Sequence, residues 1–233
     1  ILASYNWQIG AGFLHFSSES RLLIHIGNNV DLLTMDTDQF VLFVQNNQVC
    51  FALDIVLTSW RLLFNCFGQN ANGHVLDPEL SYFKKELPLI VPFHKKSSRS
   101  GSLDQYFSII GVYDGMSQDD KEASVLLSLV HLIKDTLDRY ERVIGSRLKQ
   151  LSLDGDLSQS IFFKQVLSDM LQLGIQTYQK TMLSSLMPYF YSLDLAVLTE
   201  KQKRSAHFLQ DLILPSLDPL SSFSRHQYWE QCV

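Results

Sequence analysis

The 233 residues suffice for one large domain or two small ones, and the 46% hydrophobic content can build a sizeable core. The net charge of −5 disfavours nucleic-acid binding, because phosphate backbones attract basic surfaces. No apolar run reaches the ~18 residues that a membrane-spanning helix needs. The three cysteines have no metal-type spacing and are typical of reduced thiols in the cytosol. Since the chain begins with Ile1 rather than Met, we expect a fragment of a longer protein.

The front of the chain favours short strands. Residues 1–20 show no clear period, because glycines and serines interrupt the apolar positions. Residues 21–26 and 30–35 are predicted strands, and residues 40–44 and 49–55 form the clearest hairpin. An Asn-containing turn joins the hairpin, and Asn tolerates the left-handed conformation of such turns. We therefore expect an antiparallel meander.

The next segment alternates helix and loop signals. Thr58 or Ser59 can cap a helix over residues 60–67, which ends before Gly68. Residues 87–93 are apolar and contain prolines, a composition that fits an edge strand. Residues 94–102 have the composition of a flexible basic loop.

A strand followed by a long helix is the central prediction. Residues 105–113 are rich in β-branched and aromatic side chains and predict a buried strand. Ser117 can cap a helix that we expect to run to residue 151, because apolar residues recur at steps of three or four. The first half has apolar residues beyond this stripe, which predicts that it is buried on two sides. The second half has charged residues off the stripe, which predicts that it is buried on one side.

The back of the chain is predicted to be mainly helical. Ser158 can cap a helix that continues to Met187, and a helix capped by Thr199 is expected to run to Pro215. Residues 189–198 favour a strand, and the remainder favours a loop. An antiparallel meander packed against long helices belongs to the α+β class.

Catalytic signatures are scarce. Nucleophile-elbow, P-loop and dinucleotide-binding motifs are absent, and the histidines are scattered. The segment 111–115, Gly-Val-Tyr-Asp-Gly, resembles the metal-binding motif of metal-dependent serine/threonine phosphatases, but Met116 and Ser117 replace the following His and Gly. A phosphatase-like hydrolase is therefore the alternative function. We predict no catalytic, cofactor-binding or metal-binding residue.

Charged and aromatic surface positions are predicted to bind partners. Lys95 and Lys96 lie in the basic loop, which can meet an acidic protein or lipid headgroups. Arg139 and Arg142 lie on the charged side of the predicted long helix. Tyr228 and Trp229 lie at the end of an aromatic-rich C-terminal segment. The predicted partner-binding residues are Arg139, Arg142, Lys95, Lys96, Tyr228 and Trp229.

Two families share parts of this pattern. The hairpin at 40–55, and the strand, polar loop and long helix at 106–150, resemble the longin domains of small-GTPase regulators such as the Mon/Ccz and Hermansky–Pudlak exchange-factor subunits. The segments 53–55, 110–118, 168–175 and 195–199 resemble the amino-terminal region of the seizure-threshold scaffold in the KICSTOR complex, which acts in amino-acid signalling at lysosomes.

These resemblances imply a non-catalytic protein. They imply a longin-like α/β domain over 1–151 and a mainly helical extension over 152–233. The implied function is that of a scaffold or exchange-factor subunit of a small-GTPase or nutrient-signalling (TORC) regulator in vesicle trafficking. Other protein subunits, a small GTPase and peripheral contact with endosomal or lysosomal membranes are the implied partners, with no nucleic acid and no cofactor.

Overall fold

A computed structural model describes residues 10–16, 21–25, 41–45, 48–52, 87–92, 107–111, 115–145, 147–178 and 209–232. A seven-stranded sheet forms its centre, with strand order β3-β4-β2-β1-β7-β8-β9. Its strands are β1 (Ala11–Phe16), β2 (Arg21–His25), β3 (Val41–Gln45), β4 (Gln48–Ala52), β7 (Gln150–Gly155), β8 (Ile175–Tyr178) and β9 (Leu209–Ile213). Strand β7 is parallel to both β1 and β8, and the other neighbours are antiparallel.

The fold is therefore a mixed α/β arrangement, which agrees in general with the predicted α+β class. The strand at 21–25 and the hairpin formed by β3 and β4 are confirmed. The front strands β1 to β4 pair antiparallel, as predicted, but the sheet is not a simple antiparallel meander, because β2 pairs with β4 and because β7 adds parallel pairs with β1 and β8. Strand β1 carries no alternation of apolar and polar residues, since all six of its residues are buried.

A second, two-stranded sheet pairs β5 (Leu89–Pro92) with β6 (Phe107–Ile110). The edge-strand prediction for 87–93 is confirmed. The strand predicted at 105–113 exists, but it lies outside the main sheet. Ile90 N donates to Ser128 Oγ (2.8 Å), which ties β5 to the long helix.

That helix, α2, spans Gln118–Ile144. The Ser117 hydroxyl accepts a hydrogen bond from Asp120 N (3.2 Å), as predicted for its cap. Gly145 adopts φ 70° and its N–H donates to Glu141 O, so the helix ends there rather than at residue 151. Leu148 and Leu151 continued the helical spacing by coincidence, because Leu151 belongs to β7.

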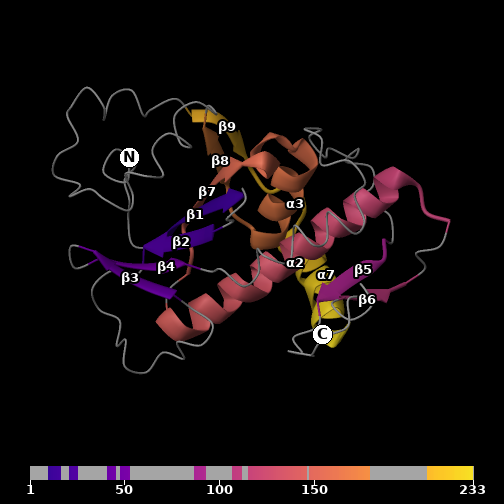
Figure 1. Ribbon diagram of the computed structural model, residues 1–233, viewed down its shortest axis with the longest axis horizontal. Coiled ribbons are helices and arrows are strands. Elements are labelled where there is room, and N and C mark those ends of the chain that lie inside the picture. Colours follow the sequence, from indigo (N-terminus) through magenta and orange to yellow (C-terminus); the bar gives the residue numbers. More distant parts are fainter. Residues whose placement is uncertain are drawn as a thin grey trace, which may run out of the picture.

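The first half of α2 is buried on two sides, which confirms that prediction (Figure 1). One side joins the core of the main sheet and α3 (Ile161–Leu171), and the other packs on β5 and on α7 (Pro219–Cys232). The buried residues on these sides are Val125, Leu126, Leu129, Val130, Leu132 and Ile133. Arg142, in the second half, is exposed.

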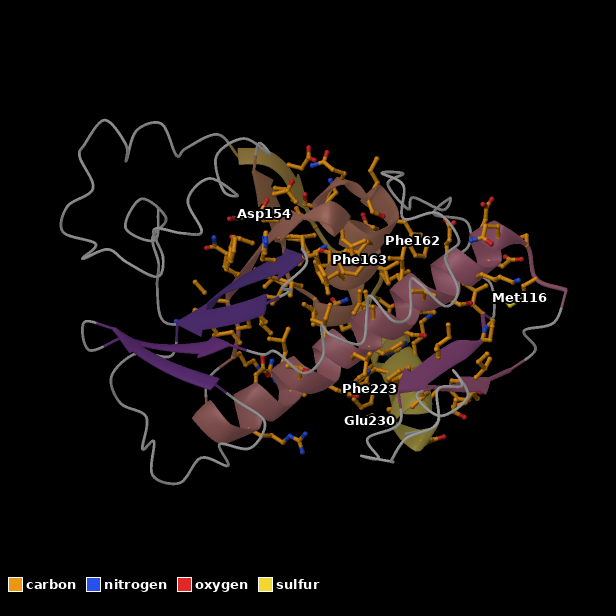
Figure 2. All side chains as sticks on the ribbon, viewed as in Figure 1. Met116, Asp154, Phe162, Phe163, Phe223 and Glu230 are labelled. Atoms are coloured by element: carbon orange, nitrogen blue, oxygen red, sulfur yellow. The ribbon has the colours of Figure 1, made fainter. Side chains whose placement is uncertain are left out.

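Helix α3 is shorter than predicted. Ser160, rather than Ser158, provides its cap by accepting a hydrogen bond from Phe163 N (3.1 Å). The left-handed Gln172 (φ 53°) ends the helix, and the chain returns as β8. The two phenylalanines of its first turn, Phe162 and Phe163, point into the core (Figure 2).

Two predictions for the C-terminal part of the chain are wrong. Residues 209–213 form β9 instead of the end of a helix, and α7 replaces the expected loop. Asp169 on α3 fixes the connection between them by accepting hydrogen bonds from Ser216 N and Leu217 N. Among the described residues, no helix combines the length and apolar character needed to cross a membrane.

Several predictions lie outside the described residues. They are the strand at 30–35, the helix at 60–67, the strand at 189–198 and the helix at 199–208. The division of the chain at residue 151 stays a prediction.

Candidate functional site

The carboxyl ends of parallel strands mark one edge of the main sheet. Strands β1 and β7 run in register, with Phe16 opposite Gly155 at their ends. In open sheets of this kind, ligands bind beyond the carboxyl ends of the parallel strands. This edge is therefore the first place to look for a site.

Gly155 brings the end of β7 close to β1. Its φ is +87°, and a Cβ there would overlap the carbonyl oxygen of Phe16 and lie 2.7 Å from its carbonyl carbon. Only glycine fits both the conformation and the space. The chain then turns through the 3-10 helix η4 (Asp156–Gln159), which Ser158 Oγ closes by donating to Gly155 O (2.7 Å).

Helix α3 starts directly after this turn. Strand β7 is thus joined to the N-terminus of α3 by a short segment that starts at Gly155 and ends at Ser160. We call this segment, residues 155–160, the β7–α3 turn. Backbone N–H groups at such a helix start carry partial positive charge and suit phosphate or carboxylate ligands.

A buried polar pair lies on the other face of the sheet from α3. His15 Nδ1 is 3.1 Å from Asp154 Oδ2, and both residues are buried. The ring of Phe13 stacks on His15 with centroids 6.4 Å apart. Figure 2 shows Asp154 at this end of the sheet. Sequence reasoning missed the pair, because its two members are 139 positions apart.

The predicted partner-binding residues do not gather at this edge. Lys95 and Lys96 lie outside the described residues, and Arg139 lies on α2. Arg142 is exposed near the end of α2, where its Nε donates to Asp138 O (3.3 Å). Their role in partner binding stays a prediction.

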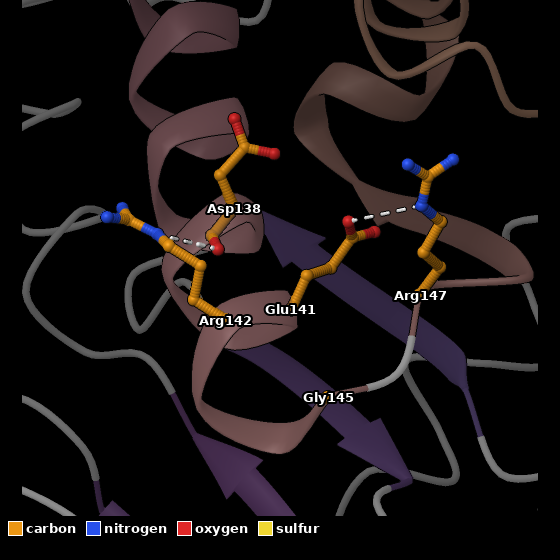
Figure 3. A pocket seen from close by; sticks show the side chains of 5 residues that line it. All are labelled: Asp138, Glu141, Arg142, Gly145 and Arg147. Carbon is orange, nitrogen blue, oxygen red and sulfur yellow. Dashed lines mark hydrogen bonds and ion pairs between the residues drawn. The ribbon is translucent and has the colours of Figure 1, made fainter.

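Arg142 also borders an open hollow of about 400 Å³ at the C-terminal end of α2 (Figure 3). Glu141 also lines the hollow, and its Oε2 is 3.9 Å from the Nε of Arg147. Arginines near a helix C-terminus offset its negative dipole, so these charges have a structural explanation. The residues that line the hollow are Asp138, Glu141, Arg142, Gly145 and Arg147.

The two aromatic residues of the predicted set differ in exposure. Tyr228 is 55% exposed on α7, whereas Trp229 is fully buried against α2. The Trp229 ring stacks on His131 (centroids 5.0 Å apart), and its Nε1 donates to Asp135 Oδ2 (2.8 Å). Partner binding by either residue stays a prediction, and Trp229 contributes to the packing of α7.

Two histidines at the contact between α2 and α7 have opposite pKa shifts. Burial and the positive charge of His226 lower the pKa of His131 to about 3. Burial acts against the charged form of His226 as well, but the carboxylates of Asp135 and Asp138 outweigh it and raise its pKa to about 9. One ring is therefore neutral and the other charged at neutral pH.

We predict a stability maximum near pH 6.5, the ordinary histidine pKa. Above it, folded His226 holds a proton that the unfolded chain releases, so stability falls as pH rises toward 9. Below it, the unfolded chain protonates His131 while the folded chain does not, so stability falls as pH drops toward 3. Besides Asp135 and Asp138, the charges facing this pair are Lys134, Arg225 and Glu230.

Urea denaturation at a series of pH values in metal-free buffer checks this. In His226→Gln, the decline on the alkaline side should disappear. Persistence of the same decline in the variant would assign it to other groups.

Comparison with known proteins gives structural matches alone. No family model matches the sequence, and no curated protein matches it significantly. Glycerol kinase from Plasmodium falciparum, solved with ADP, superposes with a TM-score of 0.65 at 16% identity, covering 95% of this chain and 46% of that one. Xylulose kinase from Rhodospirillum rubrum gives 0.65 at 11% identity over 99% and 48%. A carbohydrate kinase from Novosphingobium aromaticivorans gives 0.63 at 14% identity over 96% and 46%.

These neighbours correct the expectations drawn from the longin and KICSTOR resemblances. Both resemblances are wrong, because the matched pieces are local hairpin and strand–helix patterns that many folds share. The predictions of a non-catalytic scaffold, an exchange-factor subunit and a TORC or trafficking role are contradicted with them, since these structural neighbours are carbohydrate kinases and not longin-domain proteins.

The remaining expectations fare differently. The phosphatase alternative has no support among these neighbours, and the predicted location at endosomes or lysosomes has none either. The predicted protein partners, the small GTPase among them, and the absence of nucleic-acid binding stay predictions. At these identities the likeness establishes the fold alone. The chain spans about half the length of the kinases it matches and has the fold of that half.

Proposed function

We propose that this chain is part of a carbohydrate kinase, and that its β7–α3 turn binds the phosphates of the nucleotide. The observation that carries the proposal is the close approach of Gly155 to Phe16 at the carboxyl edge of two parallel strands, directly before a capped helix. Nucleotide phosphates bind at such strand–turn–helix junctions, where backbone N–H groups and the helix dipole meet the negative charge.

Backbone groups, rather than a charged side chain, supply the positive potential of this site. Ser160 keeps the first turn of α3 in place by accepting from Phe163 N. Ser158 holds the 3-10 turn against Gly155. A fixed turn has little entropy to lose when a ligand binds, which favours affinity.

The acceptor class is inferred from the fold. The neighbours are named for glycerol, xylulose and carbohydrate substrates, so we infer a polyol or sugar hydroxyl as the acceptor of the phosphoryl group. Phosphoryl transfer needs positioning and charge neutralisation around an in-line transition state. Among the described residues, we assign the binding of the nucleotide phosphates to the β7–α3 turn, and we assign no residue as a general base.

An assay of acceptor-dependent ADP formation tests the proposal. Because the chain spans about half of the kinases it matches, the assay uses the full protein to which it belongs. That protein is incubated with ATP and Mg²⁺, with and without glycerol, xylulose or gluconate, and ADP is measured by coupled oxidation of NADH. We expect at least one acceptor to raise ADP formation above the rate without acceptor. Equal rates with and without every acceptor, in protein that is folded by circular dichroism, would overturn the proposed kinase activity.

A further inference from the structure

The contact between α2 and α7 holds a cluster of ligand-type atoms away from the β7–α3 turn. His226 on α7 is 4% exposed, and its Nε2 faces three carboxylates. The nearest oxygens are Asp135 Oδ1 at 3.2 Å, Asp138 Oδ2 at 3.5 Å and Glu230 Oε1 at 3.9 Å. Figure 2 shows Glu230 on α7, beside the long helix.

The buried Nε2 of His226 lies near several carboxylate oxygens. Within the described residues it has no hydrogen bond of acceptable geometry, although carboxylates surround it. A buried polar atom without an aligned partner is rare in folded proteins and needs an explanation. Nitrogen and oxygen ligands around a tetrahedral Zn²⁺ ion lie about 3.3 Å apart, close to the separations of Nε2 from these oxygens.

The other atoms of the same side chains are already held in place. Trp229 Nε1 donates to Asp135 Oδ2 and Lys134 Nζ donates to Asp138 Oδ1. The other oxygen of each of these two carboxylates lies near Nε2. The Nδ1 atom of His226 lies 3.1 Å from Nδ1 of His131, so one of the two rings donates to the other. In metalloproteins, hydrogen bonds from neighbouring residues to the ligand side chains hold those side chains in the orientation that the metal needs.

We propose that Asp135, His226 and Glu230 form a binding site for a divalent transition-metal ion, with Zn²⁺ as its best occupant. Their ligand atoms all lie within 4.8 Å of one another. Asp138, 3.5 Å from Nε2, is the nearest candidate for a fourth ligand. Imidazole nitrogen favours Zn²⁺ over Mg²⁺ and Ca²⁺, which prefer oxygen alone. The charges of the three carboxylates and Lys134 leave an excess of two negative charges, which Zn²⁺ balances.

The bound ion would fasten α7 to α2. Two ligands come from α7 and one or two from α2, so the ion bridges the helices. Glu230 is exposed and gives the ion access from solvent. Because binding requires both helices in place, Zn²⁺ should stabilise the folded chain. The site is independent of nucleotide binding and would remain if the proposed kinase activity failed.

The test uses chelator-treated protein at mildly alkaline pH, where fewer protons compete for the imidazole. Isothermal titration with ZnCl₂ should show one equivalent bound, with a raised melting temperature, and CoCl₂ should give the visible absorption of tetrahedral Co²⁺. Glu230→Gln removes an exposed ligand with little effect on folding and should weaken Zn²⁺ binding at least tenfold. Glu122→Gln, at the other end of α2, should bind as the wild type does.

His226→Gln should abolish the Co²⁺ absorption, provided that circular dichroism shows a folded chain. Failure of the wild type to bind Zn²⁺ would overturn the proposed site. Equal affinity of the wild type and Glu230→Gln would overturn it too, because the ion would then lie elsewhere.

Discussion

Replacing Gly155 by Ala is expected to destabilise the protein by more than about 4 kcal/mol, among the largest effects of a single methyl group. The added Cβ overlaps the carbonyl oxygen of Phe16, and this contact joins two backbones. A flexible side chain could move aside, but strands β1 and β7 are central in the sheet and their register fixes both backbones. The end of β7 would have to separate from β1.

Gly115 offers a matched control. It also has a positive φ, +80°, and a Cβ there meets no heavy atom within 4 Å. Gly115→Ala should therefore show the conformational cost alone, about 1–2 kcal/mol. Urea denaturation followed by circular dichroism compares the two. Similar losses in both variants would mean that the end of β7 does not pack against Phe16.

The second large effect is expected for Phe163→Ala, at about 3–5 kcal/mol. Phe163 is fully buried, and its ring meets that of Phe16 edge to face, with centroids 5.4 Å apart and an interplanar angle of 88°. The substitution leaves a cavity between α3 and the end of β1, and it removes an aromatic contact that adds about 0.5–1.5 kcal/mol to the burial of the ring.

Phe223 on α7 provides the comparison, because it is 58% exposed. Phe223→Ala should change the free energy of unfolding by less than about 0.5 kcal/mol. Both variants can be followed in the same urea titrations. If Phe223→Ala were the more damaging of the two, α3 would not pack on the sheet as described, and the β7–α3 turn would be misplaced.

Local signals were sufficient for part of the fold. The hairpin of β3 and β4 follows from strand patterns on either side of an Asn-containing turn. The start of α2 follows from a serine cap and a helical apolar stripe. In each case the residues that determine the structure are neighbours in sequence, so their pattern can be interpreted without knowledge of the rest of the chain.

Parallel pairing was not visible in the same way. Strands β1 and β7 pair across more than a hundred residues, and central strands covered on both faces lose the alternation that marks a half-buried strand. Leu148 and Leu151 fell at helical spacing by chance. Pro219, at the first position of α7, is a helix-start signal that could have identified this helix.

The candidate site was visible in sequence only in part. An Asp-Gly-Asp turn before a serine is apparent in the sequence, but the need for glycine at position 155 comes from Phe16 on a distant strand. His226, Trp229 and Glu230 become neighbours once α7 is recognised as a helix, and Asp135 joins them only through the packing of α7 on α2. Scattered histidines therefore looked unremarkable in sequence.

Nucleotide binding at the β7–α3 turn is tested most directly by isothermal titration of the protein with ADP in the presence of Mg²⁺. Gln159 lies in η4 beside the capping Ser160, and Gln227 is exposed on α7. Gln159→Glu adds a negative charge next to the expected phosphate and should weaken ADP binding about fivefold, equivalent to about 1 kcal/mol. Gln227→Glu makes the same change elsewhere and should bind ADP as the wild type does. Absence of ADP binding to the wild type, or equal affinity of the two variants, would contradict a nucleotide site at this turn.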